Sequence, residues 1–171
     1  VVEKLELLMK KAGTGVQDRK CVAAANTNAE VTGEPASAIE LADGSVVTGK
    51  TSELMGATSA MLLNALKKLA GLPDELRLIS PSVIEPIQQL KIKHLGNHNP
   101  NLHIAEMLIA LTICAGTDEN AAKVVAKLDE LKGCEAHSSV ILSSEDQRTL
   151  AKLGINLTCE PKYQTKKLFH N

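Results

Sequence analysis

The chain has 171 residues, of which 44% are hydrophobic, and this length and composition predict one globular domain with a well-buried core. Its 19 basic and 20 acidic side chains leave a formal charge of -1, and aromatic residues are nearly absent, so no nucleic-acid partner is expected. The four cysteines are widely spaced, and neither a signal peptide nor an apolar run of bilayer length is present, so we expect reduced thiols, a cytoplasmic protein and no membrane partner.

The first predicted element is an amphipathic helix in the opening segment VVEKLELLMKKAG. Because this pattern is under way at the first residue, without an initiating methionine, we expect the chain to be a piece of a longer protein. Residues 17–32 predict a second helix, with Gly33 as its stop signal. The runs SAIEL and SVVTG then predict a β-hairpin around the turn at residues 42–44.

The longest predicted helix covers residues 52–70, where apolar side chains recur at helical spacing. Either Ser52 or Thr51 is expected to cap its start. The apolar run at 76–80 predicts a short strand, and residues 82–95 predict another helix that tolerates a proline near its start.

The last part of the chain predicts two helices, at about 102–115 and 118–131, followed by a strand in HSSVILS, a helix in SEDQRTLAKLG and a strand in INLTCEP. This order indicates an α/β fold, in which a mixed sheet carries helices on both faces. We expect residues 1–171 to form a single α/β domain. Within it, residues 83–132 are nearly all helical and predict an inserted helical sub-lobe.

A phosphate-loop pattern, G-x-x-x-x-G-K-[ST], is spelled by residues 44–51. That loop normally follows a buried strand, whereas here an Asp-Gly turn and a strand-like run occupy it, so a hairpin is favoured over a nucleotide cradle or an autonomous ATPase. Lys50, Thr51 and Ser52 remain a candidate anion site, because a helix start offers unpaired amides and the positive end of its dipole. Alternatively, Ser52 only caps the helix and Lys50 is solvated.

A second group of reactive side chains surrounds His137, which is a candidate general acid or base, or an anion ligand. In a strand, Glu135 and His137 would share one face and Cys134 the other, so a cysteine-histidine nucleophilic pair is not favoured. Cys159 and Glu160 would face the same cleft as His137 if their strands are neighbours. The alternative is a hydrogen-bonded structural histidine.

The other histidines to consider are His94, His98 and His103, around the segment LGNHNPNLH. Their spacing matches no compact zinc pattern, and no cysteine pair is close by. Structural or surface roles are therefore predicted, with His103 helping to begin the next helix. No metal site and no cofactor are predicted.

Four segments, GKTSELMGATSAMLLNALKKLAG, LGNHNP, GCEAHSSVILS and LGINLTCEP, follow one another in an order that resembles the C-terminal portion of the bacterial family called domain of unknown function 1846. The resemblance covers essentially the whole chain. It implies a missing N-terminal portion with its own glycine-rich, phosphate-loop-like stretch. It also implies a cytidine-deaminase-like α/β topology, in which two helix starts supply the zinc ligands.

At the corresponding places this sequence has residues 50–53 and 80–84, which lack the H-x-E and P-C-x-x-C residues of zinc deaminases. Zinc deamination is therefore disfavoured. The same geometry would still bring together two helix starts that suit a carboxylate or phosphate. Their lining residues would be Lys50, Thr51, Ser52, Ser80 and Ser82.

We therefore expect a C-terminal α/β domain of a larger cytosolic bacterial protein, binding an anionic or nucleotide-like small molecule at the start of helix 52–70. The sequence does not decide whether the domain is an enzyme. The alternative is a structural or oligomerisation module that supports the N-terminal portion of the same protein, as part of a homo-oligomer. A metalloenzyme is a third hypothesis, which stoichiometric bound metal would support.

Overall fold

A computed structural model of the protein describes residues 19–163, so the helix predicted in the opening segment lies outside the described residues. The helices are α2 (Lys20–Thr32), α3 (Ala57–Leu69), α4 (Pro81–Lys93), α5 (Ile104–Ala115), α6 (Glu119–Val125) and α7 (Ser144–Lys152), with a short 3-10 helix at Leu128–Leu131. The strands are β1 (Ala36–Glu40), β2 (Val46–Lys50), β3 (Glu135–Ser138) and β4 (Asn156–Cys159).

The four strands form one mixed sheet in the order β2-β1-β3-β4. Strand β1 pairs antiparallel with both β2 and β3, whereas β3 pairs parallel with β4. A parallel pair needs a crossover, and α7 supplies it, while the hairpin between β1 and β2 closes through Gly44 at a φ of 85°. The predicted hairpin, the α/β class and the mixed sheet are thus confirmed.

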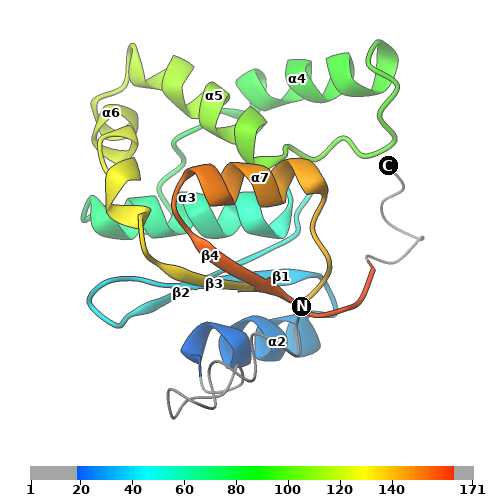
Figure 1. Cartoon of the computed structure of the whole chain (residues 1–171). Helices are drawn as coiled ribbons and strands as arrows, with labels where there is room; N and C mark the ends of the chain where they lie inside the picture. The colour runs from blue at the N-terminus through cyan, green and yellow to red at the C-terminus, as the bar shows by residue number, and fades with distance from the viewer. Residues whose placement is uncertain (1–18, 164–171) are drawn as a thin grey trace.

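Helices cover both faces of this sheet (Figure 1). Helix α2 packs on one face, and α3 packs on the other face against β1 and β2. The approach of α3 is so close that a Cβ at Gly49 would collide with the backbone of Met61. The second glycine of the phosphate-loop spelling is therefore required by helix-strand packing.

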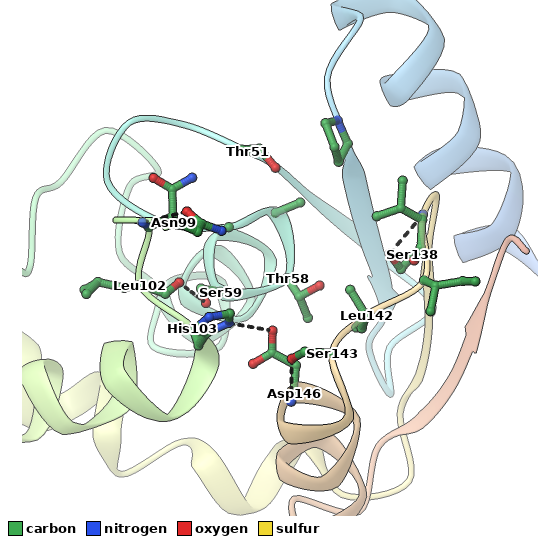
Figure 2. Close-up of a pocket in the computed structure, with 16 residues that line it drawn as sticks. Thr51, Thr58, Ser59, Asn99, Leu102, His103, Ser138, Leu142, Ser143 and Asp146 are labelled. Carbon is green, nitrogen blue, oxygen red and sulfur yellow. Dashed lines mark hydrogen bonds and ion pairs between the residues drawn. The ribbon is translucent and has the colours of Figure 1, made fainter. Parts of the chain in front are cut away.

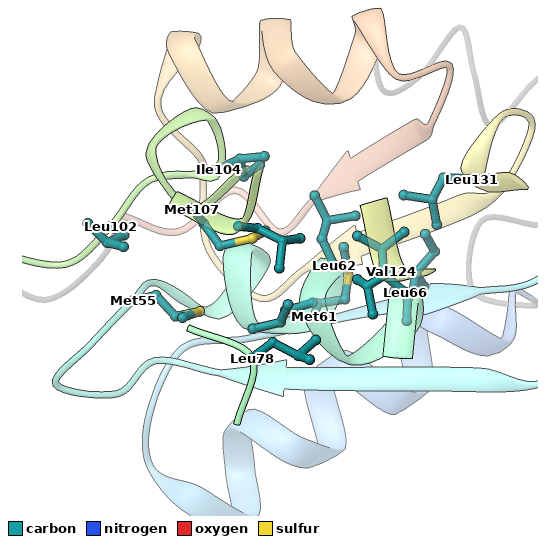
Figure 3. Packing of buried hydrophobic residues seen from close by; sticks show 14 of the residues in the cluster. Met55, Met61, Leu62, Leu66, Leu78, Leu102, Ile104, Met107, Val124 and Leu131 are labelled. Atoms are coloured by element: carbon teal, nitrogen blue, oxygen red, sulfur yellow. The ribbon is translucent and has the colours of Figure 1, made fainter. Parts of the chain in front are cut away.

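The main hydrophobic core lies between the sheet and the helices on the α3 side (Figure 3). Helix α3 contributes Met61 and Leu66, which are fully buried. The predicted sub-lobe adds Ile84 from α4, Met107 from α5 and Val124 from α6 to the same cluster. The core is built from aliphatic side chains and methionine, as the near absence of aromatic residues predicts.

The start of the long helix differs from the prediction: α3 begins at Ala57, not at residue 52. The cause is the Ser52 hydroxyl, which accepts hydrogen bonds from the amides of Leu54 and Met55 at 3.2 and 3.4 Å and so closes a turn. Serine side chains compete in this way with helical hydrogen bonding. The predicted caps Ser52 and Thr51 are therefore wrong, and Gly56 occupies the cap position.

Two predicted strands also change. The run at 76–80 forms no strand, because Leu78 and Ile79 bury their side chains in the main core without pairing to the sheet. The strand predicted in HSSVILS lies earlier, and it ends at Ser138, whose hydroxyl accepts from the amide of Val140 at 3.2 Å and turns the chain away. The third strand of the chain is therefore β3, and the helix that follows it is α7.

Candidate functional site

A cavity of about 170 Å³ lies where three helices begin (Figure 2). Residues 56–59 line it from the start of α3, His103 from the start of α5, and Ser143 and Asp146 from the start of α7. The other lining residues are Pro35, Thr51, Asn99, Asn101, Leu102, Ser138, Val140, Ile141 and Leu142. The cavity thus combines polar groups with a short apolar wall.

The start of α3 is buried and has no side-chain cap among the described residues, because Gly56 occupies the cap position. Thr58 and Ser59 in its first turn are only 3% and 2% exposed. The first amides of a helix have no acceptor within the helix, and the dipole places partial positive charge there. The cavity therefore contains hydrogen-bond donors of the kind that bind anions.

Two hydroxyl groups fix this helix start in place. The Oγ1 atom of Thr58 shares a hydrogen bond of 2.9 Å with the Oγ atom of Ser37 in β1. The Ser59 hydroxyl donates to the carbonyl of Leu102, at 3.0 Å, in the segment before α5. The first amides of α3 are therefore held by two neighbouring segments and are positioned before a ligand arrives.

Asn101 adds a further donor to the same cavity. The residue is 3% exposed, and its Nδ2 atom has no hydrogen-bond partner in the described part of the chain. The backbone around it is fixed, because its amide donates to Oδ1 of Asn99 at 2.9 Å and its carbonyl accepts from Lys91. Leaving a buried donor unpaired costs about 1 to 3 kcal/mol, so this atom favours a ligand with an acceptor.

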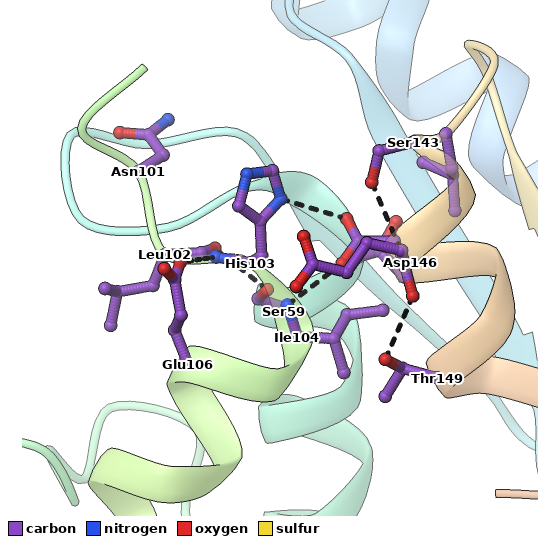
Figure 4. A network of polar contacts seen from close by, with 12 residues as sticks. Ser59, Asn101, Leu102, His103, Ile104, Glu106, Ser143, Asp146 and Thr149 are labelled. Carbon is purple, nitrogen blue, oxygen red and sulfur yellow. Dashed lines mark hydrogen bonds and ion pairs between the residues drawn. The ribbon is translucent and has the colours of Figure 1, made fainter. Parts of the chain in front are cut away.

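His103 and Asp146 form an ion pair in the cavity wall (Figure 4). Nδ1 of His103 lies 3.4 Å from Oδ2 of Asp146, while Oδ1 of Asp146 accepts from the amide of Ile104 at 3.1 Å. The Ser143 hydroxyl accepts from the Asp146 amide at 3.1 Å. The carboxylate is therefore held by the starts of both α5 and α7. Its hydrogen bond raises the pKa of His103, against the opposing effect of burial.

A second ion pair supports His103 from behind. The Nζ atom of Lys91 lies 2.7 Å from Oε1 of Glu106, and the Lys91 side chain is 1% exposed. The same carboxylate oxygen accepts from the backbone amide of His103 at 2.8 Å. This arrangement fixes the first turn of α5 and therefore the direction of the imidazole.

The residues predicted for the anion site do not come together in the structure. Thr51 lines the cavity. Lys50 is exposed at the end of β2, and Ser52 is exposed and bonded within its own turn. Ser80 caps α4, with its hydroxyl 2.8 Å from that of Ser82, and neither residue lines the cavity.

His137 lies on the opposite side of the sheet, under α2. Its Nδ1 atom is 2.7 Å from the Thr158 hydroxyl, and its Nε2 atom is 2.8 Å from Oε2 of Glu160. Strands β3 and β4 are neighbours, so the expected approach of Glu160 is confirmed, but Cys159 pairs with Ser138 and takes the other face. Burial lowers the pKa of His137 and outweighs the effect of Glu160. A catalytic role for His137 stays a prediction.

Asp146 was not predicted as a site residue, and for His103 the sequence predicted only a place at the start of the next helix. That place is confirmed, because His103 is the cap residue of α5. The helix that begins near residues 80–84 is not the one after the third strand, because that helix is α7, which begins at residue 144. The starts of α3 and α7 do meet at one cavity. Within residues 19–163, His, Cys, Asp and Glu side chains form no group of three or more that could hold a metal ion.

These features define a small α/β domain with a polar cavity at converging helix starts. The chain belongs to the family described as Domain of unknown function DUF1846, C-terminal, whose family model matches residues 17–169. It is 52% identical over 169 residues to a UPF0371 protein of Corynebacterium urealyticum, 52% identical over 168 residues to one of Streptococcus thermophilus, and 51% identical over 168 residues to one of Streptococcus pyogenes.

These alignments cover 98 to 99% of the chain but only 34% of each relative. The chain therefore spans about a third of the length of the curated relatives that it matches. Across residues 19–163, no helix has both the length and the apolar character that a membrane crossing requires.

Proposed function

We propose that this domain binds a small anionic ligand in the cavity between the starts of α3, α5 and α7. The observation that carries the proposal is the buried start of α3, which no side chain of the described residues caps. The unpartnered Nδ2 atom of Asn101 supports it independently, because it supplies a second donor to the same space.

The charges around the cavity favour an anion over a cation. His103 and Asp146 are the ionisable residues among those that line it in the described chain, and their charges offset each other when His103 is protonated. The partial positive charge of the uncapped α3 start then makes the cavity favourable for an anion. Lys50, Ser52, Ser80 and Ser82 take no part in this version of the site.

The size of the cavity limits the ligand. An apolar cavity of about 150 Å³ in another protein holds one benzene molecule, so about 170 Å³ suits an anion with few heavy atoms. A whole nucleotide is larger than this space. The bound group is therefore a small oxyanion, or the anionic end of a longer molecule.

The deaminase-like topology belongs to the same proposal. It is supported by the hairpin before α3 and the crossover from β3 through α7 to β4, which together set two helix starts at one cavity. The places of the zinc ligands would be residues 56–59 and 143–146, which contain neither the H-x-E nor the P-C-x-x-C residues. The chemistry we propose for this geometry is therefore anion binding.

The decisive experiment installs the missing cap. A Cβ at Gly56 would meet nothing closer than the Leu102 carbonyl oxygen at 4.0 Å, and the φ of -69° suits any residue. In Gly56→Asp, the new carboxylate should accept the first amides of α3 and compete with the ligand. We expect loss of saturable sulfate binding in calorimetry, together with a rise in unfolding free energy of roughly a few tenths of a kcal/mol, because glycine is only slightly worse than aspartate as a cap.

The matched control is Gly56→Ala, which adds a methyl group without an acceptor and should keep the sulfate affinity. Calorimetry is run in a buffer without other oxyanions. A wild-type chain that shows no saturable sulfate binding would overturn the proposal. So would a Gly56→Asp variant that binds sulfate as tightly as the wild type.

A second function, assembly with the rest of a longer protein, is favoured by exposed apolar side chains in and near α4 and α5. In α5, Ile109 and Ile113 are 61% and 65% exposed and lie one turn apart. Leu90, Ile92 and Leu95, in or just after α4, are 43 to 60% exposed. Because the curated relatives are about three times as long as this chain, we propose that the remainder of such a protein covers these side chains.

Hydrogen exchange tests this interface. Amides around Ile113 should exchange more slowly in a full-length protein than in the isolated chain, and Ile113→Glu should remove the difference. Thr112→Glu, at an exposed neighbouring position, is the control that should leave it unchanged. Equal exchange in the two proteins would exclude the remainder of the chain as the partner, and concentration-dependent light scattering of the isolated chain would point to a second copy instead.

A further inference from the structure

His103 extends the proposed function, and the inference rests on that function. We propose that His103 is the proton donor of the cavity: its Nε2 atom donates a hydrogen bond to the bound oxyanion, so that the anion binds together with one proton. The observations are the orientation of the imidazole, the charges around it and the size of the space in front of it.

The orientation of the ring follows from its partner. Nδ1 of His103 faces the Asp146 carboxylate, so in the neutral imidazole Nδ1 carries the hydrogen and Nε2 is an acceptor. No described residue bonds to Nε2, and the His103 side chain is 16% exposed at the cavity wall. An oxyanion has only acceptors, so it can bond to Nε2 only when the ring also carries a proton there.

The charge of the cavity also requires that His103 be protonated when an anion binds. With neutral His103, Asp146 is the one formal charge among the lining residues of the described chain, and it repels an anion. With protonated His103, the formal charges cancel and the start of α3, which no described side chain caps, remains as the net positive feature. The other charges that act on His103 are Lys91 and Glu106, which are paired with each other at 2.7 Å.

The remaining walls define the ligand further. Val140, Ile141 and Leu142, which are consecutive in the chain, form an apolar part of the cavity lining. Donors from α3 and Asn101 serve an oxyanion, while this apolar part accepts a short carbon segment. The class of ligand is therefore a small carboxylate or phosphate with few carbon atoms, bound as an anion beside a protonated imidazole.

Sulfate is the appropriate probe, because its own charge stays constant between about pH 5 and 9. We expect the dissociation constant of the chain for sulfate to rise by up to about tenfold for each pH unit above the pKa of ligand-free His103. Calorimetry in buffers of different ionisation enthalpy should show uptake of close to one proton per sulfate on the alkaline side of this pKa. Sulfate should also raise the pKa of His103 in an NMR titration of the wild-type chain, because the two bindings are reciprocal.

His103→Gln keeps a donor near the Nε2 position but does not titrate, so it should bind sulfate with little pH dependence. His98→Gln, an exposed histidine in the segment before α5, is the matched control and should retain the wild-type dependence. Sulfate binding that is independent of pH in the wild type, or an unchanged pKa of His103 on saturation, would overturn this inference and leave the proposed anion site standing. Absence of saturable sulfate binding at every pH would overturn both.

Discussion

The two sides of the sheet each hold a histidine beside a carboxylate, and the two pairs differ in every property that matters for function. On the α2 side, both ring nitrogens of His137 have partners within 2.8 Å, and the side chain is 2% exposed. On the α3 side, His103 contacts Asp146 at 3.4 Å through one nitrogen, no described residue bonds to the other, and the residue lines a cavity. We call the His137 pair closed, because both ring nitrogens have protein partners, and the His103 pair open, because only one nitrogen has a partner among the described residues.

The opposite pKa shifts follow from this difference. Burial dominates at His137 and lowers its pKa, although Glu160 is close. At His103, the hydrogen bond to Asp146 dominates and raises the pKa. A histidine next to an acid is thus a poor indicator of a site by itself. What distinguishes the open pair is the Nε2 atom of His103, to which no described residue bonds, in a side chain that lines a cavity.

The largest expected effect tests the structural role of the closed pair. His137→Ala removes two buried hydrogen bonds and leaves a cavity, so we expect a loss of about 2 to 4 kcal/mol in unfolding free energy. Urea denaturation measures it, and sulfate affinity of the folded variant should stay the same. A variant of wild-type stability with weakened sulfate binding would reverse the roles of the two histidines.

The next effect sharpens the role of the open pair. Asp146→Asn keeps an acceptor for the Ile104 amide but removes the charge beside His103, so the raised pKa of His103 should fall. An NMR titration measures this shift, and the unfolding free energy should drop by about 1 to 2 kcal/mol. Glu145→Gln, an exposed acid at the neighbouring position, is the control. An unchanged His103 pKa in Asp146→Asn would show that the pair does not act as described.

The two histidines should change the stability of the protein in opposite directions as the pH rises. The folded pKa of His103 is raised from the usual 6.5, so its contribution is complete below 6.5 and is lost as the pH rises through the folded value. The folded pKa of His137 is lowered, so its contribution is complete above 6.5 and is lost as the pH falls through the folded value. His103→Gln should remove only the alkaline decline in urea titrations. Loss of the acidic decline instead would contradict both assignments.

The smallest effect concerns the residue that the sequence favoured most. Lys50→Ala changes an exposed side chain that does not line the cavity, so the unfolding free energy should change by less than about 0.5 kcal/mol and the sulfate affinity should be unchanged. Thr51→Val is the informative companion, because Thr51 lines the cavity. A strong loss of sulfate binding in Lys50→Ala would restore the site at the end of β2.

Local signals in the sequence predicted most of the elements. The hairpin follows from its Asp-Gly turn, and α7 follows from Ser143, which accepts from the Asp146 amide as a helix cap. Ser52 shows why the predicted start of a helix can be wrong. Its hydroxyl can cap a helix or close a turn, and in the structure it closes a turn before α3. The two glycines of the phosphate-loop pattern are required for unrelated structural reasons. Gly44 adopts a positive φ in the hairpin turn, and Gly49 lets α3 pack closely against β2.

The cavity could not be predicted from local patterns, because its walls come from segments far apart in the chain. Residues 56–59, 101–103 and 143–146 meet only after β1 and β3 pair and the helices pack on one side of the sheet. The sequence also did not reveal that the described residues leave the start of α3 without a side-chain cap, since this required knowing that the helix begins after Gly56. A motif at one position in the chain carries no such information.

If the proposed ligand binds at the start of α3, which no described side chain caps, the abundance of this protein should depend on that ligand. A ligand that binds only the folded chain stabilises it by about 2.7 kcal/mol when present at a hundred times its dissociation constant. If the acceptor for Gly56 and its neighbours comes from the medium, cellular proteolysis should remove the unliganded form faster than the liganded one. The cellular concentration of the protein would then rise and fall with the concentration of the small anion.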